Sequence, residues 1–318
     1  MAYHVLRATC ETVHLGGFSH QLKPALEMQS GDRVEIESYT GFSWHDQAPP
    51  EFITSEFTDI YHNLPSERKV ASGPHLMTGP IYIHDAQPGD VLEVKIESVY
   101  PRSPIGYNLI RPGKGALPEL FTELRLRFIE LDLKNNTAEF PVDSGIHIPL
   151  KPFFGIMGVA TEDSARCSIP PGNYGGNIDN RHLQAGSTLF LPVFVPGALF
   201  SVGDGHTAQG DGEVNLTAIE TALSGVFQIK VRKDLRLTQP IAETPTHWIV
   251  HGFGESLDQA FENALKEMIQ FLCQFIGLDA EEAYVLCSLA VNFHITQVVN
   301  LPHKGVHGML AKALAPMP

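Results

Sequence analysis

The chain has 318 residues, of which 43% are hydrophobic and 18% charged, and its formal net charge is -14 at pH 7. This composition is typical of a globular protein with a substantial core and excludes a disordered chain. The negative charge argues against nucleic acid and anionic membrane surfaces as partners. Without a run of about 18 or more apolar residues, no membrane-spanning helix is expected. The four cysteines form no Cys-x-x-Cys pair, which favours a reducing cytoplasm.

Short segments separated by many of the 28 glycines and 23 prolines fill about residues 1–250 and predict a mainly β fold. The segment Val91–Val99 alternates apolar and polar residues after a Pro-Gly-Asp turn, as a half-buried strand does. Pro196-Gly197 and Ser224-Gly225 each separate two apolar segments and predict two hairpins. We therefore expect a β-sandwich or barrel-like body over about residues 1–250.

The last quarter of the chain changes its period. Apolar residues recur at helical spacing from Leu257 to Leu272, and Ser256 with Gln259 forms a capping-box pattern in front of them. This predicts a helix over 256–277 that ends at Gly277. Three elements should follow: a helix over about 279–290, a strand over about 293–299 and a short helix after Val306. We expect this helical α+β part, about 251–318, to pack on the β body within one unit spanning 1–318.

The segment Gly203–Glu213 is the most informative part of the chain. It combines four glycines with five side chains that can bind a metal or move a proton: Asp204, His206, Gln209, Asp211 and Glu213. Glycines allow a backbone to approach a ligand closely, so the segment predicts a ligand-binding loop between two strands. The spacing fits neither a dinucleotide-binding fingerprint nor an EF-hand. The alternative is a tight surface turn rich in Gly and Asp.

Four further stretches combine turn residues with polar side chains: 73–80 with His75, 83–90, 153–160, and 172–179 with Asn177 and Asp179. Taken in this order, and followed by the run Gly186–Val202 and then Gly203–Glu213, they resemble the acetamidase/formamidase family. The resemblance spans about residues 70–300. The first 65 residues match poorly, and Asn292-Phe293-His294 stands where many relatives have a triplet similar to Asp-Leu-Arg.

This resemblance implies a β-rich homo-oligomer, a dimer or tetramer, with a bound divalent metal. It also implies hydrolysis of a small neutral carboxamide, similar to formamide or acetamide or a lactam, to a carboxylate and ammonia or an amine. Amide hydrolysis needs an activated water and a polarised carbonyl, both of which a metal supplies, and a carboxylate that relays the proton.

Site roles follow from this chemistry. We expect the metal ligands to be Asp204, His206, Asp211 and Asp179. We expect the catalytic groups to be Glu213, as general base, with His206 and His75, and the substrate-binding residues to be Asn177 and Gln209. Carboxylates suit Ca²⁺ and imidazole suits Zn²⁺, so both metals are candidates.

Two other functions remain open from the sequence. The first is a non-catalytic β-rich protein that binds Ca²⁺ in the segment Gly203–Glu213. The second is a thiol-dependent amidase whose nucleophile is Cys167. Cys167 has no His or Glu at a recognisable spacing, which argues against a thiol nucleophile.

Overall fold

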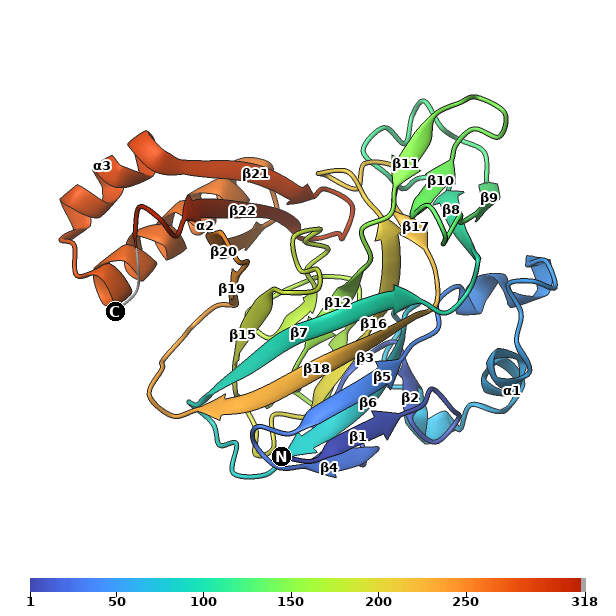
Figure 1. The fold of residues 1–318 in the computed structure, drawn as a ribbon, viewed down its shortest axis with the longest axis horizontal. Helices are drawn as coiled ribbons and strands as arrows, with labels where there is room; N and C mark the ends of the chain where they lie inside the picture. The colour runs from blue at the N-terminus through green and yellow to red at the C-terminus, as the bar shows by residue number, and fades with distance from the viewer. Residues whose placement is uncertain (316–318) are drawn as a thin grey trace.

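The computed structural model describes residues 1–315 and is dominated by β-strands, with its two longest helices near the C-terminal end (Figure 1). The predicted mainly β fold with C-terminal α+β elements is therefore confirmed. Within residues 1–315, no helix is both long and apolar enough to cross a bilayer.

One nine-stranded sheet runs through the body and into the C-terminal part. Its strands lie in the order β1 (Tyr3–Leu6), β5 (Arg33–Glu37), β18 (Leu223–Arg232), β7 (Val91–Pro101), β15 (Thr188–Pro192), β19 (Ile241–Glu243), β20 (His247–Gly254), β22 (Lys304–Ala311) and β21 (Val291–Gln297). All neighbours in it are antiparallel except β1 and β5. The N-terminal strand and the C-terminal elements thus belong to the same sheet.

A second nine-stranded sheet carries most of the polar segments identified above. Its main path is β14 (Gly175–Asn177), β12 (Phe153–Gly158), β16 (Phe200–Ala208), β17 (Ile219–Glu220), β8 (Ile105–Ile110) and β9 (Arg125–Glu130). On β16 it branches through β6 (Leu76–Ile83) to β2 (Val13–Leu15) and β4 (Leu26–Met28). Two small sheets pair β10 (Thr137–Glu139) with β11 (His147–Pro149), and β3 (Gly17–Phe18) with β13 (Arg166–Cys167).

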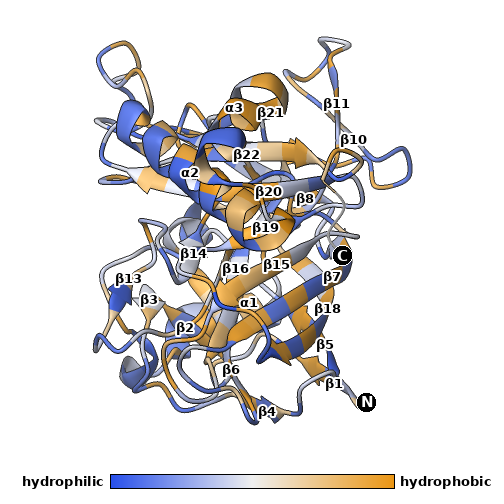
Figure 2. Ribbon diagram, turned by 90° about the vertical axis from the view of Figure 1, so that its left-hand side faces the viewer, coloured by the Kyte–Doolittle hydropathy of each residue, from blue (hydrophilic) through white to orange (hydrophobic). Residues whose placement is uncertain are grey.

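The largest core lies between these two sheets. Phe154 of β12 and Phe200 of β16 face Phe227 of β18, with ring centroids 5.6 and 6.3 Å apart. The strands β7 and β18 alternate hydrophobic and hydrophilic residues along their length (Figure 2). One face of each therefore supplies the core, as in a β-sandwich.

Three short helices lie between β5 and β6 in the chain: η1 (Phe42–Gln47), α1 (Ser55–Asn63) and η2 (Ser66–Arg68). The C-terminal part contains α2 (Leu257–Phe271), its π-helical continuation η3 (Leu272–Ile276) and α3 (Ala280–Ala290). The amphipathic helix α2 packs on β20 and β22 through Ala260 and Ala264 and turns its hydrophilic side outward (Figure 2).

The predicted helix starts and stops are confirmed. The Ser256 hydroxyl accepts a hydrogen bond from the Gln259 amide at 3.2 Å, and Asp279 caps α3 in the same way at 2.8 Å. The helical segment ends at Gly277, whose φ is 84°. The predicted helix after Val306 is wrong, because this segment forms β22, between β20 and β21. Gly308 of β22 lies under the ring of Phe293, where a Cβ would approach within 2.8 Å.

Both predicted hairpins are also wrong. The turn at Gly197 leads from β15 in one sheet to β16 in the other, so the two strands are not paired. Gly225 lies inside β18, where a Cβ would come within 2.6 Å of the ring of Phe154. This glycine makes room for an aromatic ring and does not form a turn.

Candidate active site

The segment Gly203–Glu213 is a strand in its first half and a loop only in its second half, since β16 extends to Ala208. Asp204 and His206 are two residues apart on β16 and point to the same side of the sheet. Glu220 of β17 lies directly across from His206 in the antiparallel pair. Glycines flank the acid here because the backbones of neighbouring strands crowd them: a Cβ on Gly205 would lie 2.3 Å from the carbonyl oxygen of Thr221.

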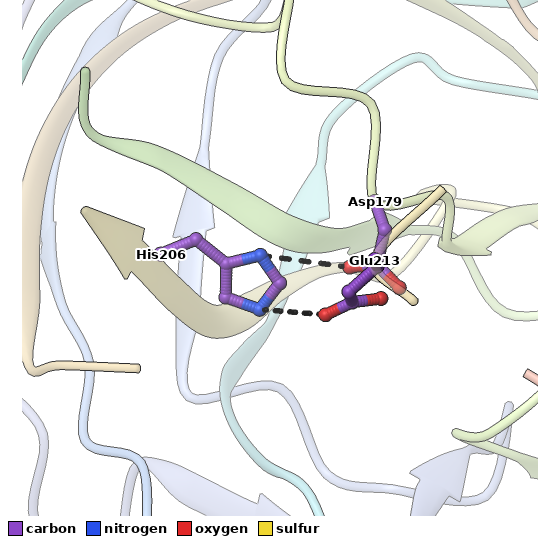
Figure 3. Close-up of side chains that lie close together, drawn as sticks. All are labelled: Asp179, His206 and Glu213. Carbon is purple, nitrogen blue, oxygen red and sulfur yellow. Dashed lines mark ion pairs between the residues drawn. The ribbon is translucent and has the colours of Figure 1, made fainter. Parts of the chain in front are cut away.

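Four carboxyl groups and one imidazole form a buried cluster. Its members are Asp179, Asp204, His206, Glu213 and Glu220, and the most accessible of them is 6% exposed. Asp179 follows β14, and Glu213 lies in the loop after β16. Figure 3 shows the carboxyl groups of Asp179 and Glu213 facing the two ring nitrogens of His206. We call these five residues the acid cluster.

Gln209 sets the tautomer of His206. The side-chain nitrogen of Gln209 donates to the carbonyl oxygen of Asp179 at 2.8 Å, so its Oε1 is left to face His206. His206 Nδ1 lies 2.9 Å from that oxygen and donates to it. The other nitrogen, Nε2, then carries the lone pair in the neutral ring. A histidine that binds a metal is usually held by such a bond on its second nitrogen.

His206 Nε2 faces three carboxyl groups. It lies 3.1 Å from Glu220 Oε1, 3.4 Å from Asp204 Oδ2 and 3.9 Å from Glu213 Oε1. Ligand atoms around a tetrahedral ion with bonds of about 2.0–2.1 Å are themselves about 3.3 Å apart. These distances therefore match the separations of ligands that share one ion.

Asp179 lies on the Nδ1 side of the ring. Its Oδ1 is 3.8 Å from His206 Nδ1, and its Oδ2 accepts a hydrogen bond from Asn300 Nδ2 at 2.5 Å. Asn300 follows β21, so the C-terminal part of the chain contributes directly to the cluster. The backbone amide of Asn300 donates to Gln297 Oε1 at 2.9 Å, which fixes the turn that carries Asn300.

Burial and mutual repulsion disturb the protonation of the acid cluster. Burial raises the pKa of Glu220 to about 7 and that of Asp179 to about 6, and it raises the pKa of Glu213 well above its ordinary value. Burial alone would lower the pKa of His206, but the carboxyl groups of Glu220 and Asp204 raise it. The charges of His206 and His75 hold the pKa of Asp204 below its ordinary value despite burial. Perturbed pKa values of this kind cluster at functional sites.

The residues of the cluster fit a cation. Four of their buried polar atoms have no hydrogen-bond partner among the described residues: Asp179 Oδ1, His206 Nε2, Glu213 Oε2 and Glu220 Oε2. Buried polar atoms are almost always hydrogen-bonded, so these atoms lack a partner that the protein does not supply. Two sets of three, Asp179–His206–Glu213 and Asp204–His206–Glu220, each offer ligand atoms within 4.8 Å of one another. The buried group can therefore bind a metal ion.

The backbone leaves room for such an ion. Gly155 of β12 lies beneath the cluster, and a Cβ there would be 2.3 Å from Asp179 Oδ1 and 2.8 Å from Asp204 Oδ2. Three of the acids, Asp179, Asp204 and Glu213, have left-handed backbone with φ of 52, 57 and 46°. Such conformations are costly for residues other than glycine and are concentrated at functional sites.

A cavity of about 240 Å³ leads to the acid cluster. Asp179, Asp204, Glu213 and Glu220 line it, together with the predicted residues His75 and Asn177. The Oδ1 atom of Asn177 is buried and has no partner within residues 1–315, whereas its Nδ2 donates to the carbonyl oxygen of Ile169 at 3.2 Å. His75 is fixed by a 2.8 Å hydrogen bond between Nδ1 and the Ser168 hydroxyl.

Asp211, predicted as a metal ligand, lies apart from the cluster. Its exposed carboxyl group is 3.6 Å from His294 Nδ1 and 3.9 Å from Arg181, and it lines a different cavity of about 500 Å³. The left-handed conformation of Glu213 points that carboxyl group inward, while Asp211 stays at the surface. Gln209, predicted to bind substrate, accepts the hydrogen bond of His206 Nδ1.

Glu220 is not among the residues predicted from the sequence. It lies in the first of the two apolar segments that Ser224-Gly225 separates. A lone acid in a segment of this kind is the signal that could have identified it, because acids are rarely buried. Cys167, of the thiol alternative, belongs to the small sheet with β3 and is not among the described residues that line the cavity near the acid cluster.

A sheet scaffold with a buried acid–imidazole cluster at the end of a small cavity is an arrangement suited to hydrolysis. Comparison with known proteins identifies the family. The model of the acetamidase/formamidase family matches residues 65–164 and 160–311. The chain belongs to this family and is an amidase, a hydrolase of carbon–nitrogen bonds. This sets aside the non-catalytic alternative.

Two solved structures support the assignment over nearly the whole chain, and a formamidase supports it over about half. The structure of an acetamidase from Bacillus halodurans is 31% identical, with a TM-score of 0.83 and 98% of each chain covered. An acetamidase structure from Yersinia enterocolitica is 28% identical, with a TM-score of 0.85, and the match covers 99% of this chain and 93% of that chain. A formamidase of Methylophilus methylotrophus is 33% identical over 179 residues, 46% of this chain and 43% of the relative.

Proposed function

We propose that the protein hydrolyses a small neutral carboxamide to a carboxylate and ammonia, and that the acid cluster is its reaction centre. The observation that carries this proposal is the convergence of His206 Nε2 and three carboxyl groups, within 3.1–3.9 Å, at the buried side of a cavity. Water, amide carbonyl and proton acceptor must meet in such a hydrolysis, and the acid cluster beside this cavity offers groups for all three.

We propose Asp204, His206 and Glu220 as the ligands of a divalent metal. When bound, such a metal supplies Lewis-acid polarisation of the amide carbonyl and lowers the pKa of a water molecule. The imidazole ligand favours Zn²⁺ over Ca²⁺, because Ca²⁺ prefers six to eight oxygen ligands. Asp179, whose Oδ1 also lacks a partner, completes the set or holds His206 in place.

Glu213 is the proposed general base. Its carboxyl group lines the cavity, and burial raises its pKa well above the ordinary value, which makes it a stronger proton acceptor than an exposed glutamate. It takes the proton of the attacking water and delivers it to the leaving nitrogen. Glu213 thus serves as base and then as acid.

Asn177 and His75 are proposed to orient the amide. Asn177 lines the cavity, and its Oδ1 has no donor among the described residues, so it suits the N–H of a carboxamide and offers nothing to the corresponding ester oxygen. The His75 ring is held by Ser168 at its Nδ1, which leaves Nε2 for the substrate. The homo-oligomer expected from the sequence and its cytoplasmic location stay predictions.

The test is ammonia release from formamide, acetamide and larger amides by the purified protein, before and after chelation and after reloading with Zn²⁺ or Ca²⁺. Activity should be lost with the metal and return with Zn²⁺, while alkylation of Cys167 should leave it unchanged. Absence of ammonia at every metal loading would refute the proposal, and inactivation by alkylation would favour the thiol mechanism.

A further inference from the structure

Two chemically different sets of side chains line the cavity that leads to the acid cluster. Polar and acidic side chains surround the proposed reaction centre, and Arg111 and Lys114 add two basic groups to the lining. A larger apolar set also lines the cavity and includes Phe42, Trp44, Leu109, Leu216, Val299 and Leu301. A cavity lined by both sets fits a ligand that has a polar group and an apolar group.

The size of the cavity points the same way. Its volume of about 240 Å³ approaches the lower end of the range, about 300–1,000 Å³, that accommodates drug-sized ligands. Formamide and acetamide consist of little more than the amide group itself. Either would fill only the space beside the acid cluster and leave apolar side chains of the cavity exposed to water.

Phe42 and Trp44 belong to the 3₁₀ helix η1, in a segment that precedes the first residue matched by the family model, residue 65. This segment is packed against α1. The His45 ring stacks on Tyr61 of α1 with centroids 4.2 Å apart, and His45 Nε2 lies 3.1 Å from the Thr58 hydroxyl. Phe42 packs against Tyr61 at 5.3 Å. The wall is therefore preformed and does not depend on a bound ligand.

Gly41 allows η1 to lie this close to the cavity. Its φ is 78°, and a Cβ on it would come within 3.1 Å of the Tyr107 ring and 3.2 Å of the Phe52 ring. Tyr107 lines the cavity and also pairs with Glu220 across β8 and β17. The aromatic wall and the acid cluster are thus parts of one packed structure.

We propose that the preferred substrate is a carboxamide with an aryl or branched alkyl group, larger than acetamide, and that Phe42 and Trp44 determine this specificity. The inference rests on the proposed amide hydrolysis and deepens it. The apolar group packs against Phe42 and Trp44, while the amide lies at the acid cluster. The packing is made in the ground state and the transition state alike, so it acts mainly on KM.

Phenylacetamide and acetamide form a matched pair, because they differ by one phenyl group. Burial of that group should raise kcat/KM roughly 10- to 150-fold for the wild-type protein. Trp44→Ala and Phe42→Ala should each reduce this ratio at least fivefold, mainly through a higher KM for phenylacetamide. Trp44→Phe should keep most of the preference, and Tyr284→Ala, an exposed aromatic truncation on α3, should leave the ratio unchanged.

The outcomes separate the two proposals. Turnover of acetamide with no preference for phenylacetamide, or a preference that survives both alanine variants, would overturn the specificity inference and leave the hydrolytic function intact. Absence of ammonia from both amides at every metal loading would overturn the proposed function itself. Inhibition by phenylacetate, tighter than by acetate and weakened in Trp44→Ala, should accompany the expected result and provides a readout for variants with low turnover.

Discussion

His206 and Glu220 lie directly opposite each other on β16 and β17, with His206 Nε2 3.1 Å from Glu220 Oε1. The cross-strand pairing fixes both side chains on the same face of the sheet. The proposed ligands are therefore supported by two hydrogen-bonded strands. Such a support keeps ligand atoms in place more accurately than a loop does.

Glu213→Gln should lower kcat by about 10² to 10⁴, because the variant keeps the size of the side chain and loses the proton acceptor. Metal content should remain near that of the wild type, since Glu213 is proposed as a base and not as a ligand. Steady-state kinetics and elemental analysis of the same preparation test both statements. Full activity in this variant would exclude Glu213 as the base.

Gly155→Ala should weaken metal binding at least tenfold. The added methyl group would lie 2.3 Å from Asp179 Oδ1 and must displace the carboxyl groups that surround the ion. Gly210→Ala is a matched control, because a Cβ at Gly210 meets nothing within 4 Å. Metal affinity can be measured by competition with a chromogenic chelator. Equal affinities in the two alanine variants would contradict the proposed location of the metal.

Gln209→Leu should lower metal affinity about 10- to 100-fold, the usual effect of losing the group that orients a histidine ligand. Leucine fills similar space but cannot accept a hydrogen bond from His206 Nδ1. Gln209→Glu keeps an acceptor at this position and should retain more of the affinity than Gln209→Leu. If the leucine variant bound metal as tightly as the wild type, His206 would not depend on Gln209 for its tautomer.

His251 should make the protein sensitive to mild acid. The neutral ring is held at both nitrogens: Nδ1 donates to the Pro240 carbonyl at 3.1 Å, and Nε2 accepts from Asn180 Nδ2 at 3.0 Å. The amide of Asn180 cannot flip freely, because its Oδ1 accepts from the His182 backbone at 3.0 Å. Burial lowers the pKa of His251 to about 4.

The sign of the effect follows from this shift. His251 of the unfolded chain takes up a proton below about pH 6.5, whereas His251 of the folded protein takes one up only below about pH 4. The free energy of unfolding therefore falls as the pH falls from about 6.5 to about 4. The slope is about 1.4 kcal/mol per pH unit for one group. Urea denaturation of His251→Gln and wild type at pH 7, 6 and 5 should show this slope as the difference between them. If the free energies of unfolding of the two proteins changed equally with pH, His251 would not be the source of the acid sensitivity.

The local order of apolar, polar and turn residues was enough to predict the β-rich body, the two long helices and part of the candidate site. Asp204 and His206 could be found because acid, imidazole and glycine alternate in a short segment, and Asp179 and Asn177 because paired glycines precede them. Asp211 fits the same pattern but lies outside the acid cluster. The backbone conformation of the loop after β16, which the pattern does not reveal, decides whether Asp211 or Glu213 turns inward. The pairing of His206 with Glu220 depends on sheet register, which the sequence does not display.

The turns illustrate the same limit. Pro-Gly and Ser-Gly pairs indicate turns when glycine is needed for a left-handed backbone, as it is at Gly197 with φ of 77°, where the turn joins strands of two sheets. At Gly225 the glycine serves packing against Phe154, and the strand continues through it. The two uses of glycine look alike until the neighbouring strands are known.

The position of β22 has a consequence for biosynthesis. This strand follows β20 and β21 in the chain, yet it lies between them and pairs with both. β20 can pair with β19 as soon as it is translated, but its other edge and β21 find their partner only when β22 has been translated. Until then, β21, which leads into Asn300 and the cavity wall at Val299 and Leu301, lacks its partner strand. The cavity is therefore completed late in synthesis, and until then the unpaired edges of β20 and β21 are open to association with other chains.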